Sequence, residues 1–243
     1  MADLVLDVQK LSAGYGGLPI VQDVDVQARK GEVTVIVGLN GAGKSTLLKA
    51  IAGVLTPTAG KVILGGLDLR GRPPEYILRK GISYVPQLDN VFPSLSVREN
   101  LEMGAYILRS GVRQKIDEIC DIFPDLRDAL KRPARTLSGG QRHMLAISRG
   151  LMVQPHVLLL DEPTAGLAPL VEMSVWENIL TIRSTGVALL VVDQNVRRAL
   201  SHADRAYVMS LGRNHVSGSG EELLRSDEVG ALYAVVTEDS RGP

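Results

Sequence analysis

Alternating and continuous apolar runs predict strands in the first part of the chain. Apolar and polar residues alternate over residues 4–8 and, less regularly, over 21–26, as expected for strands with one buried face. Residues 33–37 are a continuous apolar run rich in β-branched side chains, which is typical of a strand buried on both faces. Two further segments are strand-like, residues 61–64 and 82–85.

The pattern changes to a helical one in the middle of the chain. Ser96 followed by Glu99 is a capping-box pattern, and we expect it to open a helix that continues through Ile107. Further helices are predicted over residues 114–123 and 141–152. The block of residues 91–151 is therefore predicted to be a helical insertion.

Strands resume after this block. Continuous apolar runs over 157–160 and 187–192 predict two strands buried on both faces, with a helix over 171–182 between them. The alternation of strand and helix indicates an α/β domain with a largely parallel sheet. After these elements we expect a strand over residues 208–211 and a glycine-rich turn over residues 212–220. A short helix is expected to follow this turn.

Charge and composition narrow the class of function. Lys plus Arg and Asp plus Glu number 27 each, so the chain lacks the broad positive charge of a nucleic-acid-binding protein. The single cysteine, Cys120, excludes an intramolecular disulfide. No apolar run approaches the roughly 18–20 residues needed to cross a bilayer. We therefore expect any role at a membrane to depend on a partner.

The strongest candidate for a functional site is a glycine-rich turn that precedes a helical pattern over residues 44–52. We expect Gly53 to end this helix. It fits G-x-x-x-x-G-K-[ST], the Walker A pattern, in which backbone N–H groups and a helix start hold phosphates. We expect Lys44 to contact the β- and γ-phosphates, Ser45 to bind Mg²⁺ and Thr46 to contact the α-phosphate. The alternative, an ordinary glycine-rich turn, is disfavoured by the strand before it and the helix after it. The predicted nucleotide-binding residues here are Gly38, Leu39, Asn40, Gly41, Ala42, Gly43, Lys44, Ser45 and Thr46.

Two adjacent carboxylates follow the predicted strand 157–160. Asp161 suits the Walker B role of reaching Mg²⁺, and Glu162 suits a general base for an attacking water. The alternative is that both residues cap the next helix, because acidic residues after a strand are common. The Walker A pattern upstream favours the catalytic interpretation.

A third motif is the run Leu-Ser-Gly-Gly-Gln at residues 137–141, called here the signature segment. Its backbone N–H groups and the Ser138 hydroxyl open a helix and could hold an anion. A plain helix N-cap at Ser138 is the alternative.

Walker A, the signature segment and Walker B, in this order and spacing, resemble the nucleotide-binding domain of ABC transporters over about residues 4–235. The resemblance implies one domain, residues 1–243, with a P-loop NTPase core, a largely parallel sheet, an N-terminal antiparallel β subdomain and the inserted helical subdomain. It also implies that the cofactors are ATP and Mg²⁺ and that the chain is an ATPase.

The family pattern assigns further roles. Tyr15 resembles the aromatic residue that stacks on adenine, with core or surface packing as the alternative. Gln87 resembles the glutamine that contacts Mg²⁺ and the attacking water, so it joins Asp161 and Ser45 as a metal-site candidate. The resemblance also implies residues that act in trans on the nucleotide of a second subunit, namely Ser138, Gly139, Gly140 and Gln141.

Two positions depart from the general family pattern. Ala168 stands where an aspartate is usual, and Gln194 stands where a switch histidine is usual. Glutamine cannot take up a proton but can hydrogen-bond a γ-phosphate, so Gln194 is kept as a catalytic-site residue beside Glu162 and Gln87. With their neighbours, these departures resemble importers of branched-chain amino acids and the related urea and amide importers.

The resemblance implies partners and a location. The partners are a second ABC ATPase, either a copy or a paralogue, two integral membrane permease subunits and, indirectly, a solute-binding protein. Phe92 and Pro93 are candidate permease contacts, with subdomain core as the alternative. The location is cytoplasmic, on the inner face of the plasma membrane through the permease. The alternatives are an ABC ATPase without a transport role and an ATP-dependent switch with weak hydrolysis.

Overall fold

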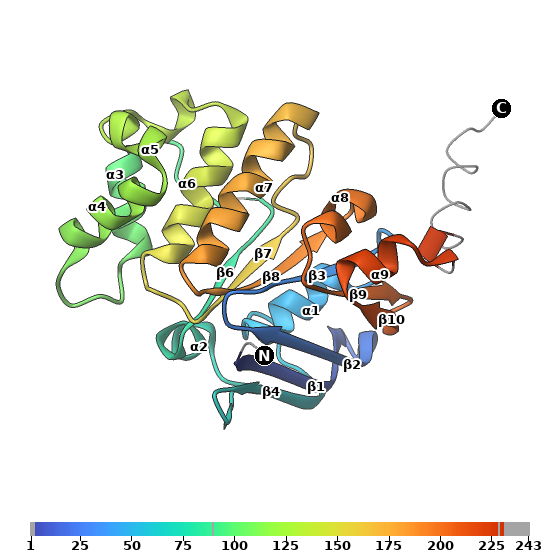
Figure 1. Cartoon of the computed structure of the whole chain (residues 1–243). Helices are drawn as coiled ribbons and strands as arrows, with labels where there is room; N and C mark the ends of the chain where they lie inside the picture. The colour runs from blue at the N-terminus through green and yellow to red at the C-terminus, as the bar shows by residue number, and fades with distance from the viewer. Residues whose placement is uncertain (1–2, 89, 228, 231–243) are drawn as a thin grey trace.

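A computed structural model describes residues 3–88, 90–227 and 229–230. In this part of the chain the strands form two sheets (Figure 1). The first is antiparallel, with strand order β2-β1-β4-β5, and its strands are β1 Leu4–Tyr15, β2 Leu18–Arg29, β4 Ala59–Leu64 and β5 Leu67–Asp68. The second has the order β10-β9-β3-β8-β7-β6 and is parallel except for the β9–β10 pair. Its strands are β3 Val33–Gly38, β6 Ile82–Val85, β7 Val157–Asp161, β8 Ala188–Asp193, β9 Arg205–Ser210 and β10 Arg213–Gly218.

Helices cover both faces of the parallel-rich sheet. Helix α1 contacts strands of both sheets, and α3 to α6 gather on the other side, next to α7 (Figure 1). The described helices are α1 Lys44–Ile51, α2 Pro74–Lys80, α3 Val97–Gly104, α4 Val112–Ile122, α5 Pro124–Ala129, α6 Gly139–Leu151, α7 Pro169–Ser184, α8 Val196–Ser201 and α9 Gly220–Leu224, with a 3₁₀ turn at Ala134–Thr136. Over the residues described, none of these helices has the length and apolar character needed to span a membrane.

Alternate residues of β3 divide the core in two. Val33, Val35 and Val37 belong to one core cluster with residues of α6, α7 and α8, and α8 contacts β3, whereas Ile36 belongs to a second cluster with α1 and the antiparallel sheet. Every residue of β3, β7 and β8 is buried. These strands are therefore covered on both faces, as their continuous apolar runs predict, because side chains of a strand point alternately to its two faces.

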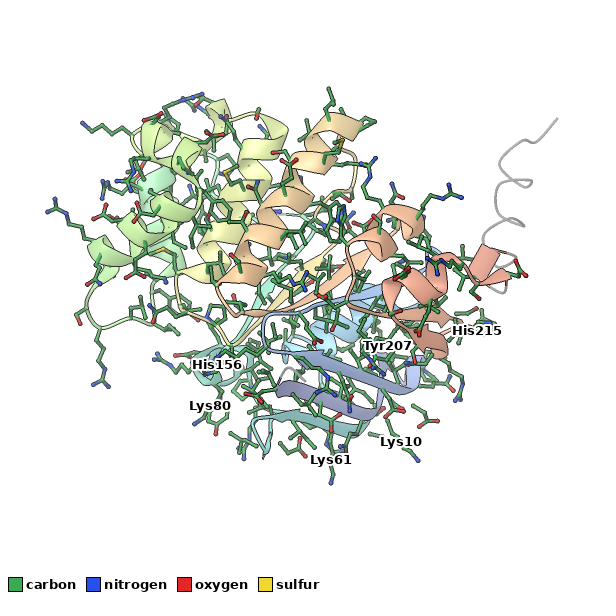
Figure 2. All side chains as sticks on the ribbon, viewed as in Figure 1. Lys10, Lys61, Lys80, His156, Tyr207 and His215 are labelled. Atoms are coloured by element: carbon green, nitrogen blue, oxygen red, sulfur yellow. The ribbon has the colours of Figure 1, made fainter. Side chains whose placement is uncertain are left out.

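A buried tyrosine joins the two sheets. Tyr207 on β9 is labelled in Figure 2. Its hydroxyl accepts hydrogen bonds from the Gln27 backbone N–H at 3.0 Å and from the Arg205 Nε–H at 2.9 Å. At the other end of β2, the β1–β2 hairpin reaches the turn before α1, since a Cβ on Gly43 would lie 3.1 Å from the Ile20 carbonyl oxygen. The antiparallel sheet thus forms one wall beside the glycine-rich turn.

The predicted elements are present, with changes at their ends. The capping box of Ser96 and Glu99 is confirmed, but the helix it opens ends at Gly104 rather than Ile107. The strand predicted over 4–8 is the first part of the 12-residue β1, and the strand predicted over 21–26 is the middle of the 12-residue β2.

The prediction of a glycine-rich turn over 212–220 is wrong, because this segment contains β10. It is a polar edge strand whose residues alternate between exposed and half-buried positions, and its pairing with β9 places Val216 opposite Val208. A polar edge strand has no continuous apolar run that would mark it in the sequence. It is recognised only by its hydrogen-bonded pairing with the neighbouring strand. The short helix expected after it is confirmed as α9.

Candidate nucleotide-binding site

The turn between β3 and α1 has the backbone of a phosphate-binding loop. Gly41 and Gly43 have φ values of 81° and 93°, in the left-handed region that favours glycine. At Gly38 a Cβ would lie 2.5 Å from the Met209 carbonyl oxygen, so a side chain is excluded by close approach of β9. The loop leads directly into α1, whose first N–H groups and positive dipole end favour an anion.

Lys44 lies inside this loop. Its side chain is buried, and Nζ donates to the carbonyl oxygens of Gly38 at 2.9 Å and Leu39 at 3.1 Å. Burial lowers the pKa of Lys44, and the nearby Glu162 and Asp161 carboxylates oppose this shift. The ammonium group is therefore kept where phosphate oxygens would be bound.

Two oxygen ligands for a divalent cation lie next to each other. The Ser45 hydroxyl donates to Asp161 Oδ1 at 2.8 Å, and the Tyr84 hydroxyl donates to Asp161 Oδ2 at 2.9 Å. Mg²⁺ prefers oxygen ligands and usually binds one or two protein groups together with phosphates and waters. The described residues contain no group of three His, Cys, Asp or Glu side chains that could hold a metal alone, so Ser45 and Asp161 fit an ion shared with a nucleotide.

Tyr84 is a site residue that sequence reasoning missed. Its pKa is raised, first by burial and then by the charge of Asp161, so the phenol stays protonated and donates to that carboxylate. Tyr84 lies on β6, opposite Leu159 of β7, two positions before Asp161. In the sequence, Tyr84 is marked only by its place three residues before Gln87. The pairing of β6 with β7 is needed to show that its hydroxyl contacts Asp161.

Glu162 lies where three strand ends meet. Its Oε2 accepts from Gln87 Nε2 at 2.9 Å and from Gln194 Nε2. The residue is 7% exposed and has a φ of 48°, an uncommon conformation for a residue with a side chain. Burial raises its pKa, with the Gln194 hydrogen bond and Lys44 opposing the shift. The three predicted catalytic-site residues are thus brought together around one carboxylate.

The remaining predicted nucleotide contacts line the same loop and its edge. Thr46 is buried on the first turn of α1, and the Ala42 carbonyl accepts from the Gly212 backbone N–H at 3.2 Å. Leu39 and Asn40 lie on the exposed part of the loop. Tyr15 ends β1 on the adjacent hairpin and is 50% exposed, which leaves its ring available for stacking.

The signature segment lies at the start of α6. Ser138 and Gln141 form a capping box, in which the Ser138 Oγ accepts from the Gln141 backbone N–H at 3.2 Å and the Gln141 Oε1 accepts from the Ser138 N–H at 3.1 Å. A Cβ on Gly140 would lie 2.6 Å from Val171, and one on Gly139 would lie 3.5 Å from Leu167. Ser138 is therefore the N-cap of α6. The signature segment packs beside the start of α7 and not against the Walker A loop of the same chain.

The capping alternative for Asp161 and Glu162 is wrong. Helix α7 has Ala168 as its N-cap, a residue whose side chain cannot accept a hydrogen bond. The carboxylates instead contact Ser45 and Tyr84, and Gln87 and Gln194.

The fold and the site define a P-loop ATPase of the cassette type. A family model described as ABC transporter matches residues 21–165, about 60% of the chain. The chain therefore belongs to the ABC transporter family of ATP-binding subunits, which bind ATP and hydrolyse it to power transport.

Curated relatives cover nearly the whole chain. A probable branched-chain amino acid transport ATP-binding protein, LivF, of Archaeoglobus fulgidus is 44% identical over 92% of this chain and 96% of its own length. The high-affinity branched-chain amino acid transport ATP-binding protein BraG of Pseudomonas aeruginosa is 40% identical over 94% of this chain and 99% of its own length. The lipopolysaccharide export system ATP-binding protein LptB of Haemophilus influenzae is 32% identical over 94% of this chain and 96% of its own length.

A solved structure has the same fold. The crystal structure of a nucleotide-free ATP-binding cassette from an ABC transporter superposes with a TM-score of 0.85 at 27% identity, covering 95% of this chain and 98% of that one.

Proposed function

We propose that this chain is the ATP-hydrolysing subunit of an importer for branched-chain amino acids or related small solutes. The similarity to LivF and BraG, at 44% and 40% identity, supports this class over lipopolysaccharide export, where LptB is 32% identical. The convergence of Gln87 and Gln194 on the buried Glu162 carries the proposal that the site hydrolyses ATP rather than only binding it.

The nucleotide would lie along the loop between β3 and α1. Tyr15 would stack on the base, the backbone from Gly38 to Gly43 and Lys44 would hold the phosphates, and Thr46 would contact the α-phosphate. A Mg²⁺ ion held by Ser45, Asp161 and Gln87 would neutralise phosphate charge and polarise the reacting phosphoryl group. Lys44 would exchange its two backbone acceptors for phosphate oxygens without leaving the loop.

Glu162 would accept the proton of the attacking water. Both amide donors use its Oε2, so Oε1 is the oxygen placed to act as the base. Burial, the main cause of its raised pKa, increases the basicity of the carboxylate. Gln194 would also contact the γ-phosphate through its amide.

The signature segment would complete the site of a second cassette. In the capping box the Ser138 Oγ is an acceptor, so its hydroxyl proton is free to donate to a phosphate oxygen of another subunit. Backbone N–H groups of Gly139, Gly140 and Gln141 at the start of α6 would add to this anion site. Closure of two cassettes on ATP, either two copies or two paralogues, would move two permease subunits. A solute-binding protein would deliver the solute to the permease. The permease would hold the chain at the inner face of the membrane.

Uptake of labelled leucine tests this function in cells that naturally make the chain. We expect uptake to fall when the chain is removed, to return with the wild-type chain, and not to return with Glu162→Gln. Unchanged leucine uptake together with a loss of urea or amide uptake would redirect the solute class. Unchanged uptake of all three would contradict the importer assignment and favour an ABC ATPase with another role.

A further inference from the structure

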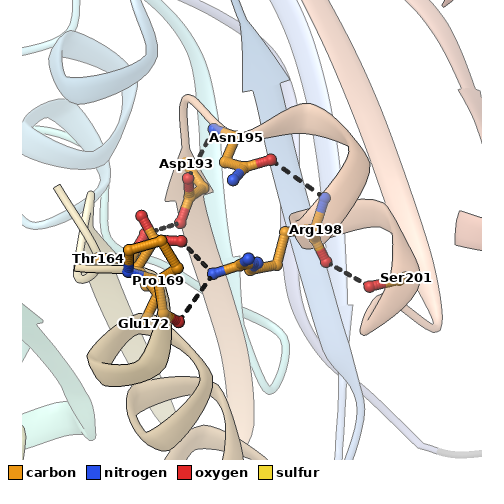
Figure 3. A network of polar contacts seen from close by, with 7 residues as sticks. All are labelled: Thr164, Pro169, Glu172, Asp193, Asn195, Arg198 and Ser201. Carbon is orange, nitrogen blue, oxygen red and sulfur yellow. Dashed lines mark hydrogen bonds and ion pairs between the residues drawn. The ribbon is translucent and has the colours of Figure 1, made fainter. Parts of the chain in front are cut away.

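A polar network around the buried residues Asp193 and Thr164 joins two turns (Figure 3). One turn, residues 164–169, leads into α7, and the other, residues 193–195, contains Gln194 and leads into α8. The two turns meet because each follows one of the parallel neighbours β7 and β8.

Asp193 is the centre of this network. It is 3% exposed; its Oδ2 accepts from Thr164 Oγ1 at 2.7 Å, and its Oδ1 accepts from the Asn195 backbone N–H at 2.8 Å. Burial raises the pKa of Asp193, whereas these hydrogen bonds lower it. Each oxygen serves a different turn, so the carboxylate fixes the residues on both sides of Gln194 relative to Thr164.

A second connection joins the helices that follow. Arg198 on α8 forms an ion pair with Glu172 on α7, and its Nη1 lies 3.4 Å from the Pro169 carbonyl oxygen. The two paired side chains are 27% and 18% exposed, so solvent screens them less than a fully exposed pair. The Arg198 backbone N–H also donates to Asn195 Oδ1 at 3.3 Å.

The 164–169 turn lies beside the signature segment, and Gly166, Ala168 and Pro169 of this turn are exposed. Leu167 of that turn lies beside the signature segment at Gly139, and the neighbouring Leu170 is 81% exposed. At position 168 the alanine side chain has no hydrogen-bonding group, so the turn depends on Thr164 and on Pro169 for polar contacts with the 193–198 region.

We propose that Asp193, Thr164 and the Arg198–Glu172 pair are positioning residues that hold Gln194 against Glu162. The inference rests on the proposed ATP-hydrolysing function.

Phosphate release by the full-length chain tests the first connection. We expect Thr164→Val to lower kcat about tenfold, the effect of losing one hydrogen bond to a charged group, with KM for MgATP within about twofold of wild type. Asp193→Asn should have a similar effect, and the double variant should lose far less than the product of the two, because both act through one contact. Thr164→Ser should recover most of the rate.

Matched controls separate positioning from general stability. Thr181→Val removes a threonine hydrogen bond on the exposed face of α7, and Arg225→Ala removes an exposed ion pair with Glu221; both should keep the wild-type kcat. Arg198→Ala should lower kcat, and Arg198→Lys should restore part of it. A wild-type kcat for Thr164→Val, in a protein whose activity Glu162→Gln abolishes, would overturn the inference and leave the proposed function standing.

Amide hydrogen exchange gives a readout that does not need turnover. In Thr164→Val, backbone amides of residues 194–198 should exchange about tenfold faster, although the substitution lies in the other turn. Unchanged exchange at residues 194–198, with faster exchange confined to 164–169, would also overturn the proposed connection.

Discussion

At the scale of single residues, Glu162 combines an uncommon backbone conformation with a buried carboxylate. A φ of 48° turns the chain directly after β7, so that Asp161 faces Ser45 while Glu162 faces Gln87 and Gln194. Two neighbouring carboxylates thereby have different partners, which suits one to a cation and the other to a proton.

Substitution Glu162→Gln tests the base directly. We expect the rate of phosphate release to fall by about 10²–10⁴-fold, because a neutral amide cannot accept the proton from water. Nucleotide binding should persist, since Lys44 and the loop from Gly38 to Gly43 are untouched. Binding is measured with a fluorescent ATP analogue, and Lys44→Ala is the control that should weaken it. A rate within tenfold of wild type would exclude Glu162 as the base.

Substitutions at Gln194 distinguish hydrogen bonding from proton transfer. Gln194→Ala should lower kcat by about 10–100-fold, because a hydrogen bond to a charged group is lost. Gln194→His should retain much of the activity but gain a pH dependence near the histidine pKa of about 6.5. Profiles of kcat against pH check this, and full activity of Gln194→Ala would show that the amide is dispensable.

How far the sequence predicts such residues depends on whether they act locally. The Walker A residues follow from a contiguous pattern, whose glycines, lysine and serine share one turn. Tyr84 and Thr164 have no such pattern, because their partners, Asp161 and Asp193, lie 77 and 29 positions away in the chain. Long-range pairs of this kind become visible only once β6, β7 and β8 are aligned.

At the scale of elements, the long apolar strands follow from the sequence, whereas the short polar elements α2, α8 and β10 do not. Helix α2 has seven residues with Ile77 as its buried residue, and α8 has six, so neither has enough turns for a clear helical period. Helix α8 begins with Asn195 as a capping side chain, and its place is set by the end of β8. Tertiary contacts rather than intrinsic propensity stabilise such helices.

Two matched capping boxes separate a structural role from a functional one. Ser96 and Ser138 open α3 and α6 with the same reciprocal hydrogen bonds. Ser96→Ala and Ser138→Ala should each lower the free energy of unfolding by about 1 kcal/mol in urea denaturation. We expect only Ser138→Ala to lower the rate of ATP hydrolysis as well. Equal rates for the two variants would show that Ser138 acts as a helix cap alone.

At the scale of the whole molecule, the proposed function divides each catalytic site between two cassettes. The Glu162 carboxylate and the glycine-rich loop lie at the carboxyl ends of the parallel strands, while the signature segment packs beside Leu167 and Val171 at the start of α7. Under that proposal one molecule would present two half-sites, and a second copy related by a rotation would place each signature segment on the other copy's loop. A homodimer of this kind is isologous, with the same surfaces used twice.

Size-exclusion chromatography with light scattering shows whether two copies of the chain associate on ATP. We measure the mass of wild type and Glu162→Gln with and without saturating MgATP. We expect Glu162→Gln to have twice the monomer mass with MgATP and the monomer mass without it, and we expect the added substitution Lys44→Ala to abolish the doubling. A Glu162→Gln protein that binds MgATP and yet keeps the monomer mass would contradict closure of two copies on ATP.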